Sequence, residues 1–246
     1  MSLPPKTFLL SAFAFVSLLL SAAAPCHAQP KVVVKNDEVA EVSKDATAMV
    51  GTYVGFFGDL KITLSIEKIV GETVLGYSIV NANQRAFSGS WQALPEGIHF
   101  LAKEPGDNAE DGNFSMTFNR QTKDLAGRWE PNDSSKTPVE LALKPRKFKY
   151  DPKAGQFPKA STKLLKTADV ENLRQAELRL MRNEIYARHG YTFTITDMQQ
   201  HFATQDWYMP MVLDVTTKLT DIETKNAALI KRYETYGAQY YDRFGR

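Results

Sequence analysis

The sequence has a single cysteine, Cys26, among its 246 residues, and this scarcity excludes several kinds of structure. One thiol cannot form an internal disulfide bond or supply the paired thiolates of a structural zinc site. Charge of one sign is also scarce, because 30 Lys and Arg residues balance 28 Asp and Glu residues. Nucleic-acid binding by phosphate neutralisation needs a strong positive excess, so we expect no nucleic-acid partner. The 43% apolar content is enough for one large or two smaller cores.

The N-terminal segment contains an uncharged apolar run, Phe8–Ala24, followed by small residues that end at Ala28. This order is typical of a secretory signal. We therefore predict that residues 1–28 are a signal peptide and that the mature chain begins at Gln29. The protein is then expected to be exported, either to the periplasm or out of the cell.

Two alternatives to a cleaved signal remain open. The first is an uncleaved membrane anchor, for which the apolar run is short compared with the roughly 20 residues of a transmembrane helix. The second is a lipoprotein acylated at Cys26, and Pro25 directly before the cysteine argues against it. We expect no transmembrane span in the mature chain. If Cys26 leaves with the signal, the mature chain also has no thiol nucleophile.

Hydrophobic periodicity divides the remaining sequence near residue 150, with a period of two before it and a helical period after it. The fold class is therefore expected to be α+β, with an antiparallel β-barrel-like domain followed by a small three-helix domain. The predicted organisation is a signal peptide at 1–28, a flexible leader at 29–48, the β domain at 49–144, a proline-interrupted connector at 145–162 and the helical domain at 163–246.

Short alternating runs such as Ile62, Leu64 and Ile66 recur along the β domain and give about eight strands, the first near Gly51–Phe56. Even spacing and a single apolar face favour a meander that closes into a barrel, which removes unpaired strand edges. A two-sheet sandwich is the competing fold. Large residues are expected to point into the barrel, and two glycines on the same phase should allow the strands to bend. The large inward residues are Phe87, Trp91, Phe100, Phe114, Phe118 and Trp129, and the glycines are Gly89 and Gly127.

Helix signals mark three helices in the C-terminal part. The first is expected from about Asp169 to His189, with Gly190 as a left-handed cap. Capping boxes at residues 196–199 and 220–223 predict a second helix up to about Phe202 and a third from 221 to about 236. The aromatic loop that begins at Trp207 is expected to pack the helices together.

The run Arg182-Asn-Glu-Ile-Tyr-Ala-Arg-His-Gly190 is followed by Trp207-Tyr208 and by Leu219-Thr-x-x-Glu223-x-x-Asn226. Over about residues 163–236 the sequence resembles the YARHG domain, a bacterial module. The resemblance implies an exported or extracellular domain without an assigned biochemical activity, often joined to other envelope modules. Its motif residues here include Asn183, Glu184, Arg188 and Gly190.

The motif allows a binding interpretation and a structural one. Arg182, Tyr186 and His189 lie at i, i+4 and i+7, so they share a helix face, and with Trp207 they form our predicted binding residues. Such a patch would suit an anionic glycan or a carboxylate-bearing peptide. In the structural interpretation, which we favour, these polar side chains form an inner network with Asn226 on the third helix. Glu184 and Arg188 are spaced for a helical ion pair that, if exposed, contributes a few tenths of a kcal/mol.

Motifs for catalysis and cofactor binding are lacking. His189 and His201 match no zinc-binding spacing. A calcium loop that began at Asp107 would have Ala109 at its third position and Phe118 at its twelfth, where ligands belong, so we predict that the acidic loop at 107–112 is a solvated hairpin tip. We therefore predict no metal and no cofactor. We interpret the protein as a non-catalytic cell-envelope interaction module whose partner is an envelope protein or a cell-wall polymer. One alternative is a β-barrel carrier of a small hydrophobic ligand. A third is an unrecognised hydrolase, since two acids brought together by folding leave no local signature.

Overall fold

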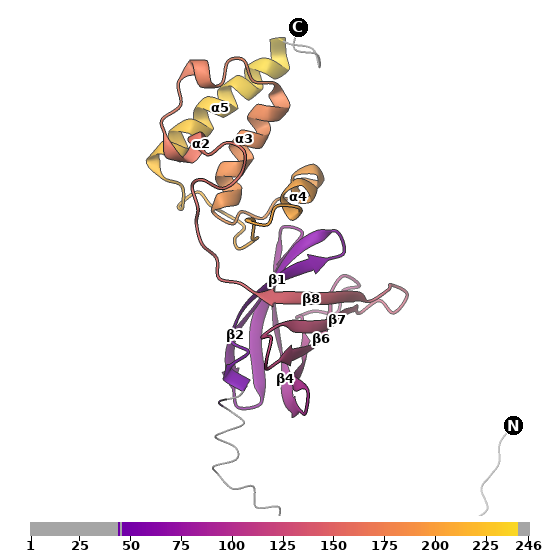
Figure 1. Cartoon of the computed structure of the whole chain (residues 1–246). Coiled ribbons are helices and arrows are strands. Elements are labelled where there is room, and N and C mark those ends of the chain that lie inside the picture. Colours follow the sequence, from indigo (N-terminus) through magenta and orange to yellow (C-terminus); the bar gives the residue numbers. More distant parts are fainter. Residues whose placement is uncertain (1–43, 45, 241–246) are drawn as a thin grey trace, which may run out of the picture. The chain divides into compact units, whose positions relative to one another are not determined.

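A computed structural model of the chain describes residue 44 and residues 46–240 (Figure 1). The predicted signal peptide, with Cys26, lies outside the described residues. Within them, eight strands follow one another, and each pairs antiparallel with the next. β1 also pairs with β8, which closes the barrel and confirms the predicted meander. The strands are β1 Gly51–Phe57, β2 Leu60–Val70, β3 Thr73–Val80, β4 Asn83–Leu94, β5 Gly97–Lys103, β6 Gly112–Asn119, β7 Leu125–Pro131 and β8 Val139–Pro145.

Phenylalanine side chains fill the interior of the barrel. Phe87, Phe100, Phe114 and Phe118 are at most 3% exposed, as the alternation along their strands predicts. The Phe87 ring lies 6.3 Å from the Phe100 ring and 5.4 Å from the Phe114 ring, measured between centroids. Each such side chain contributes on the order of 1.5–3 kcal/mol by leaving water. The predicted inward residues Trp91 and Trp129 are only partly buried and pack against this core.

The two glycines that were predicted to let the strands bend also let neighbouring strands approach closely. A Cβ at Gly89 would lie 1.8 Å from the carbonyl oxygen of Leu101, and one at Gly127 would lie 2.1 Å from that of Ser115. Real Cβ atoms do not approach backbone atoms so closely. Any larger residue would therefore push β4 away from β5, or β7 away from β6.

The acidic loop between β5 and β6 is exposed at residues 107–110, as predicted for a solvated hairpin tip, but not at Asp111. Asp111 is fully buried, and its carboxylate pairs with the guanidinium of Arg85 from β4. Glu104 is also buried and accepts a hydrogen bond of 3.1 Å from the indole nitrogen of Trp129. The prediction was wrong for Asp111 because its partner lies 26 residues earlier and leaves no local signal.

The C-terminal part contains the short helix α2 (Lys159–Thr162), the 3-10 helix η1 (Thr167–Asp169), α3 (Gln175–Arg188), α4 (Thr196–Ala203) and α5 (Asp221–Tyr240). α3 begins later than predicted because the Glu177 carboxylate accepts the backbone N–H of Arg174 at 2.9 Å and fixes the first turn there. Its predicted end is confirmed, since Gly190 follows with a left-handed φ of 79°.

The other two predicted helix starts had different outcomes. At α5, the Thr220 N–H donates to Glu223 at 3.0 Å and the Glu223 N–H donates to the Thr220 hydroxyl at 3.2 Å, which is the predicted capping box. At α4, Thr196 is the first helical residue and no side chain caps the helix.

α3 and α5 lie side by side (Figure 1) and share an apolar core. In this core, Leu178, Met181 and Ile185 of α3 pack with Ala227 and Ile230 of α5. A second, aromatic cluster contains Phe193, Phe202 and Tyr208, with Trp207 packed against it, as predicted for the aromatic loop. Among the described residues, no helix combines the length and the hydropathy needed to cross a membrane.

Candidate functional site

The ion pair between Glu184 and Arg188 of α3 is buried. The two side chains are 2% and 0% exposed, and Arg188 Nη2 lies 2.8 Å from Glu184 Oε2. The sequence identified this pair but left its burial open, because the segment that covers it comes from about 30 residues earlier. Burial makes the pair far more sensitive to loss of one partner than a surface pair, since the remaining charge is left without compensation.

Each member of the pair also bonds to the covering segment. Glu184 accepts the backbone N–H of Gln156 at 2.7 Å and that of Phe157 at 2.8 Å, while Arg188 Nε donates to the carbonyl of Ala154 at 2.8 Å. We call residues 150–157 the clamped segment. It contains no helix or strand, so these bonds satisfy backbone groups that have no partner in a ladder.

The Glu184–Arg188 pair belongs to a buried network of polar side chains, and Glu223 of α5 is the second centre of this network. Its carboxylate bonds to His189 Nε2 at 2.7 Å, to the Ser161 hydroxyl at 2.6 Å and to the N–H of Thr220 at 3.0 Å. Burial raises the pKa of Glu223, but hydrogen bonds from His189, Ser161 and Thr220 outweigh it and lower the pKa from 4.5 to about 2. The Ser161 hydroxyl also accepts a bond of 3.0 Å from Arg188, which joins the two centres.

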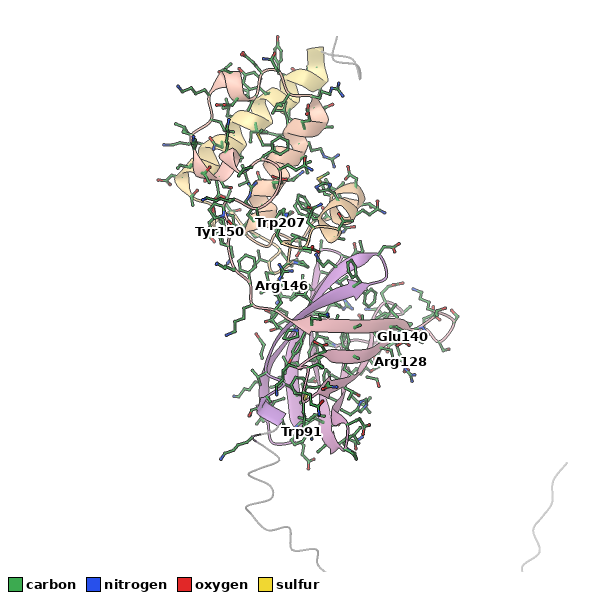
Figure 2. The ribbon with its side chains drawn as sticks, viewed as in Figure 1. Trp91, Arg128, Glu140, Arg146, Tyr150 and Trp207 are labelled. Carbon is green, nitrogen blue, oxygen red and sulfur yellow. The ribbon has the colours of Figure 1, made fainter. Side chains whose placement is uncertain are left out.

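Tyr150, which lies outside the three predicted helices (Figure 2), covers the end of the motif at His189. Its ring stacks on the His189 ring with centroids 4.5 Å apart, and its hydroxyl donates to Glu223 at 3.1 Å. Burial and the neighbouring Glu223 carboxylate together raise the pKa of Tyr150 to about 12. The hydroxyl therefore stays protonated and remains a donor at physiological pH.

Asn226 fixes the chain just after the clamped segment. Its side chain accepts the N–H of Leu165 at 2.8 Å and donates to the carbonyls of Ala160 at 2.8 Å and Lys163 at 2.6 Å. Asn226 is fully buried, and the sequence predicted that it lies on the inward side of its helix and needs a partner.

The predicted binding residues fall into three different surroundings. Arg182 bonds to Glu234 of α5 at 2.9 Å, and its guanidinium lies 5.8 Å from the centre of the Tyr186 ring. His189 is 7% exposed and bonds to α5 through Glu223. Trp207 is half-buried in the aromatic cluster, where its ring lies 5.9 Å from that of Phe202. The structure thus brings Arg182 and Tyr186 together, while His189 and Trp207 contact other partners.

Sequence reasoning missed Gly155. Its φ is +85°, and a Cβ there would lie 2.6 Å from the Glu184 carboxyl carbon, so no other residue fits without displacing the clamped segment. A glycine inside the predicted connector was the only available signal.

The network holds neighbouring chain segments in place. Its charged side chains are buried and bonded to one another, so none presents a free nucleophile or acid to solvent. Across residues 44 and 46–240, no group of three or more His, Cys, Asp or Glu side chains is placed to hold a metal ion.

Residues 156–235 match the YARHG domain family. The match confirms the resemblance seen in the sequence and begins earlier, inside the clamped segment. YARHG domains occur in exported proteins and indicate an extracellular protein-interaction module. No curated protein and no solved structure was found to match the chain.

Proposed function

We propose that the chain is an exported, non-catalytic interaction protein of the bacterial cell envelope, located in the periplasm or secreted, and that its YARHG domain binds the partner. The partner is another envelope protein or a cell-wall polymer. The observation that carries this proposal is the match of residues 156–235 to a module of exported proteins. The apolar run that predicts a signal peptide supports export.

The acidic residues of the network bond to groups within the protein, and this supports a binding module over an enzyme. General acid–base catalysis needs a titratable side chain within reach of a substrate. Glu184 is 1% exposed and Glu223 is fully buried, and both accept several hydrogen bonds within the protein. In this structure both carboxylates are therefore occupied by partners within the protein, and the side chains around them are the ones in contact with solvent.

We propose that Tyr186, Arg182 and Trp207 contribute the binding surface and that His189 supports it from inside. Tyr186 and Arg182 keep part of their surface in contact with solvent, and Trp207 is half-buried. Tyrosine, tryptophan and arginine are the residues that most often dominate the energy of protein interfaces. His189 instead bonds to Glu223 beneath the Tyr150 ring.

Binding of the mature chain, residues 29–246, to isolated periplasmic proteins and to purified cell-wall polymer tests the proposal. We expect Tyr186→Ala and Trp207→Ala to weaken binding at least tenfold while the helical circular dichroism is retained. Phe56→Ala is the matched control, since this aromatic side chain is 51% exposed on β1 and should leave binding unchanged. Failure of the mature chain to bind any envelope fraction would overturn the proposal.

The packing of the barrel interior supports this proposal over the alternative of a ligand carrier. Phe87, Phe100 and Phe114 occupy the space that a small apolar ligand would need. A native mass of the purified protein that exceeded the chain mass by a retained lipid would reverse this preference.

A further inference from the structure

The clamped segment contacts the YARHG motif mainly through its backbone. Glu184 receives two adjacent backbone N–H groups, from Gln156 and Phe157, and Arg188 donates to the carbonyl two residues before them. A carboxylate that accepts paired amides beside a guanidinium that donates to a carbonyl recognises a peptide by its main chain. The side chain of Gln156 is exposed, so these bonds do not depend on its identity.

Three positions of the segment add sequence requirements. Gly155 has no space for a Cβ, which would lie 2.6 Å from the Glu184 carboxyl carbon. Phe157 packs against the apolar core shared by α3 and α5. Tyr150 stacks on His189 and donates to Glu223. Between these positions, Asp151 and Lys153 are exposed, and the Asp151 carboxylate bonds to the N–H of Lys153 within the segment, at 2.9 Å.

We propose that Glu184, Arg188 and His189 form a recognition site for an irregular, non-helical peptide, and that the chain's own residues 150–157 occupy this site. A partner protein would present a segment with the same pattern: an aromatic residue, a glycine five positions later and a second aromatic residue two positions after the glycine. This inference rests on the proposed interaction function and goes beyond it, because it adds a second site, distinct from the Tyr186, Arg182 and Trp207 surface, and names the class of partner. The YARHG motif is then a peptide-binding motif that is covered by an internal ligand.

Covalent attachment gives the internal segment a competitive advantage. A tethered ligand acts at an effective concentration on the order of millimolar, so a free peptide binds weakly while the segment is in place. Weakening the internal segment should therefore increase binding of the same sequence added as a separate peptide. A segment that is only part of the folded core would show no such exchange.

The test uses the mature full chain with Gly155→Val and a fluorescent synthetic peptide of residues 149–159. The branched side chain collides with Glu184 and cannot easily adopt the left-handed φ of 85°. Fluorescence anisotropy should show that the peptide binds the variant at least tenfold more tightly than it binds the unmodified chain. The matched control is the same peptide with valine in place of the glycine, which should not bind either protein.

No binding of the unmodified peptide to a folded Gly155→Val chain would overturn the inference. Loss of the helical fold in both Gly155→Val and Gly155→Ala would overturn it as well, because the segment would then be an inseparable part of the core. Either result, obtained with a chain that still binds an envelope fraction, would leave the proposed interaction function standing. Peptide binding without envelope binding would overturn the proposed function instead.

Discussion

Acidification should weaken the helical domain through Glu223. In the folded protein the pKa of this carboxyl is about 2, against 4.5 as its ordinary value. Because the folded pKa is the lower one, the ionised carboxylate stabilises the fold above pH 4.5, and this stabilisation is lost as the pH falls toward 2. The difference between the two pKa values corresponds to roughly 3 kcal/mol at neutral pH.

Urea unfolding of the mature chain and of Glu223→Gln, followed by circular dichroism of the helices, measures this contribution. The stability difference between the two proteins should be large at pH 7 and should shrink by at most about 1.4 kcal/mol per pH unit between roughly pH 4.5 and 2. Asp197→Asn is the control, because Asp197 is exposed and bonds to Arg179 at 2.6 Å at the surface, where such pairs contribute about 0–1 kcal/mol.

A constant stability difference between the mature chain and Glu223→Gln over this range would refute the reasoning. It would mean that the bonds from His189, Ser161 and Thr220 do not favour the ionised form of the carboxyl.

Three further predictions follow from the packing, each measurable by chemical or thermal unfolding. Arg188→Ala should cost about 3–5 kcal/mol because it leaves the buried Glu184 unpaired, whereas Arg179→Ala at the surface should cost less than about 1 kcal/mol; equal losses would contradict the burial argument. Phe114→Ala should destabilise the barrel by about 3–5 kcal/mol, and a smaller loss would indicate that its interior is loosely packed. Ala82→Gly should stabilise the hairpin between β3 and β4 by about 0.5–1 kcal/mol, because Ala82 has a φ of 55°; destabilisation would show that its methyl group contributes more than the backbone strain costs.

The barrel was predictable because its determinants are local. Residues such as Ile62, Leu64 and Ile66 alternate along one strand, and the strand neighbours follow directly in the sequence. The same holds for the end of α3 at Gly190 and for the capping box of α5. In each case the signal and the structure it specifies lie within a few residues of each other.

The buried network was only partly predictable because its partners are distant in sequence. Glu184 and Arg188 were recognised as a pair, but the segment that buries them belongs to the predicted connector at 145–162. We propose that this segment belongs to the helical domain, so that the domain begins near Tyr150. Arg85 and Asp111 in the barrel show the same limit, since they come together only when the strands have paired.

Hydrogen exchange of the amides of Gln156 and Phe157 is the most direct test of the claim that the YARHG motif clamps the segment before it. Both amides donate to Glu184, so they should exchange slowly in the mature chain and at least tenfold faster in Glu184→Gln. Glu184→Gln also lowers the global stability, so amides in the core of α5 are the control: their exchange should quicken less than that of the Gln156 and Phe157 amides. Equal exchange of the Gln156 and Phe157 amides in the two proteins would contradict the account.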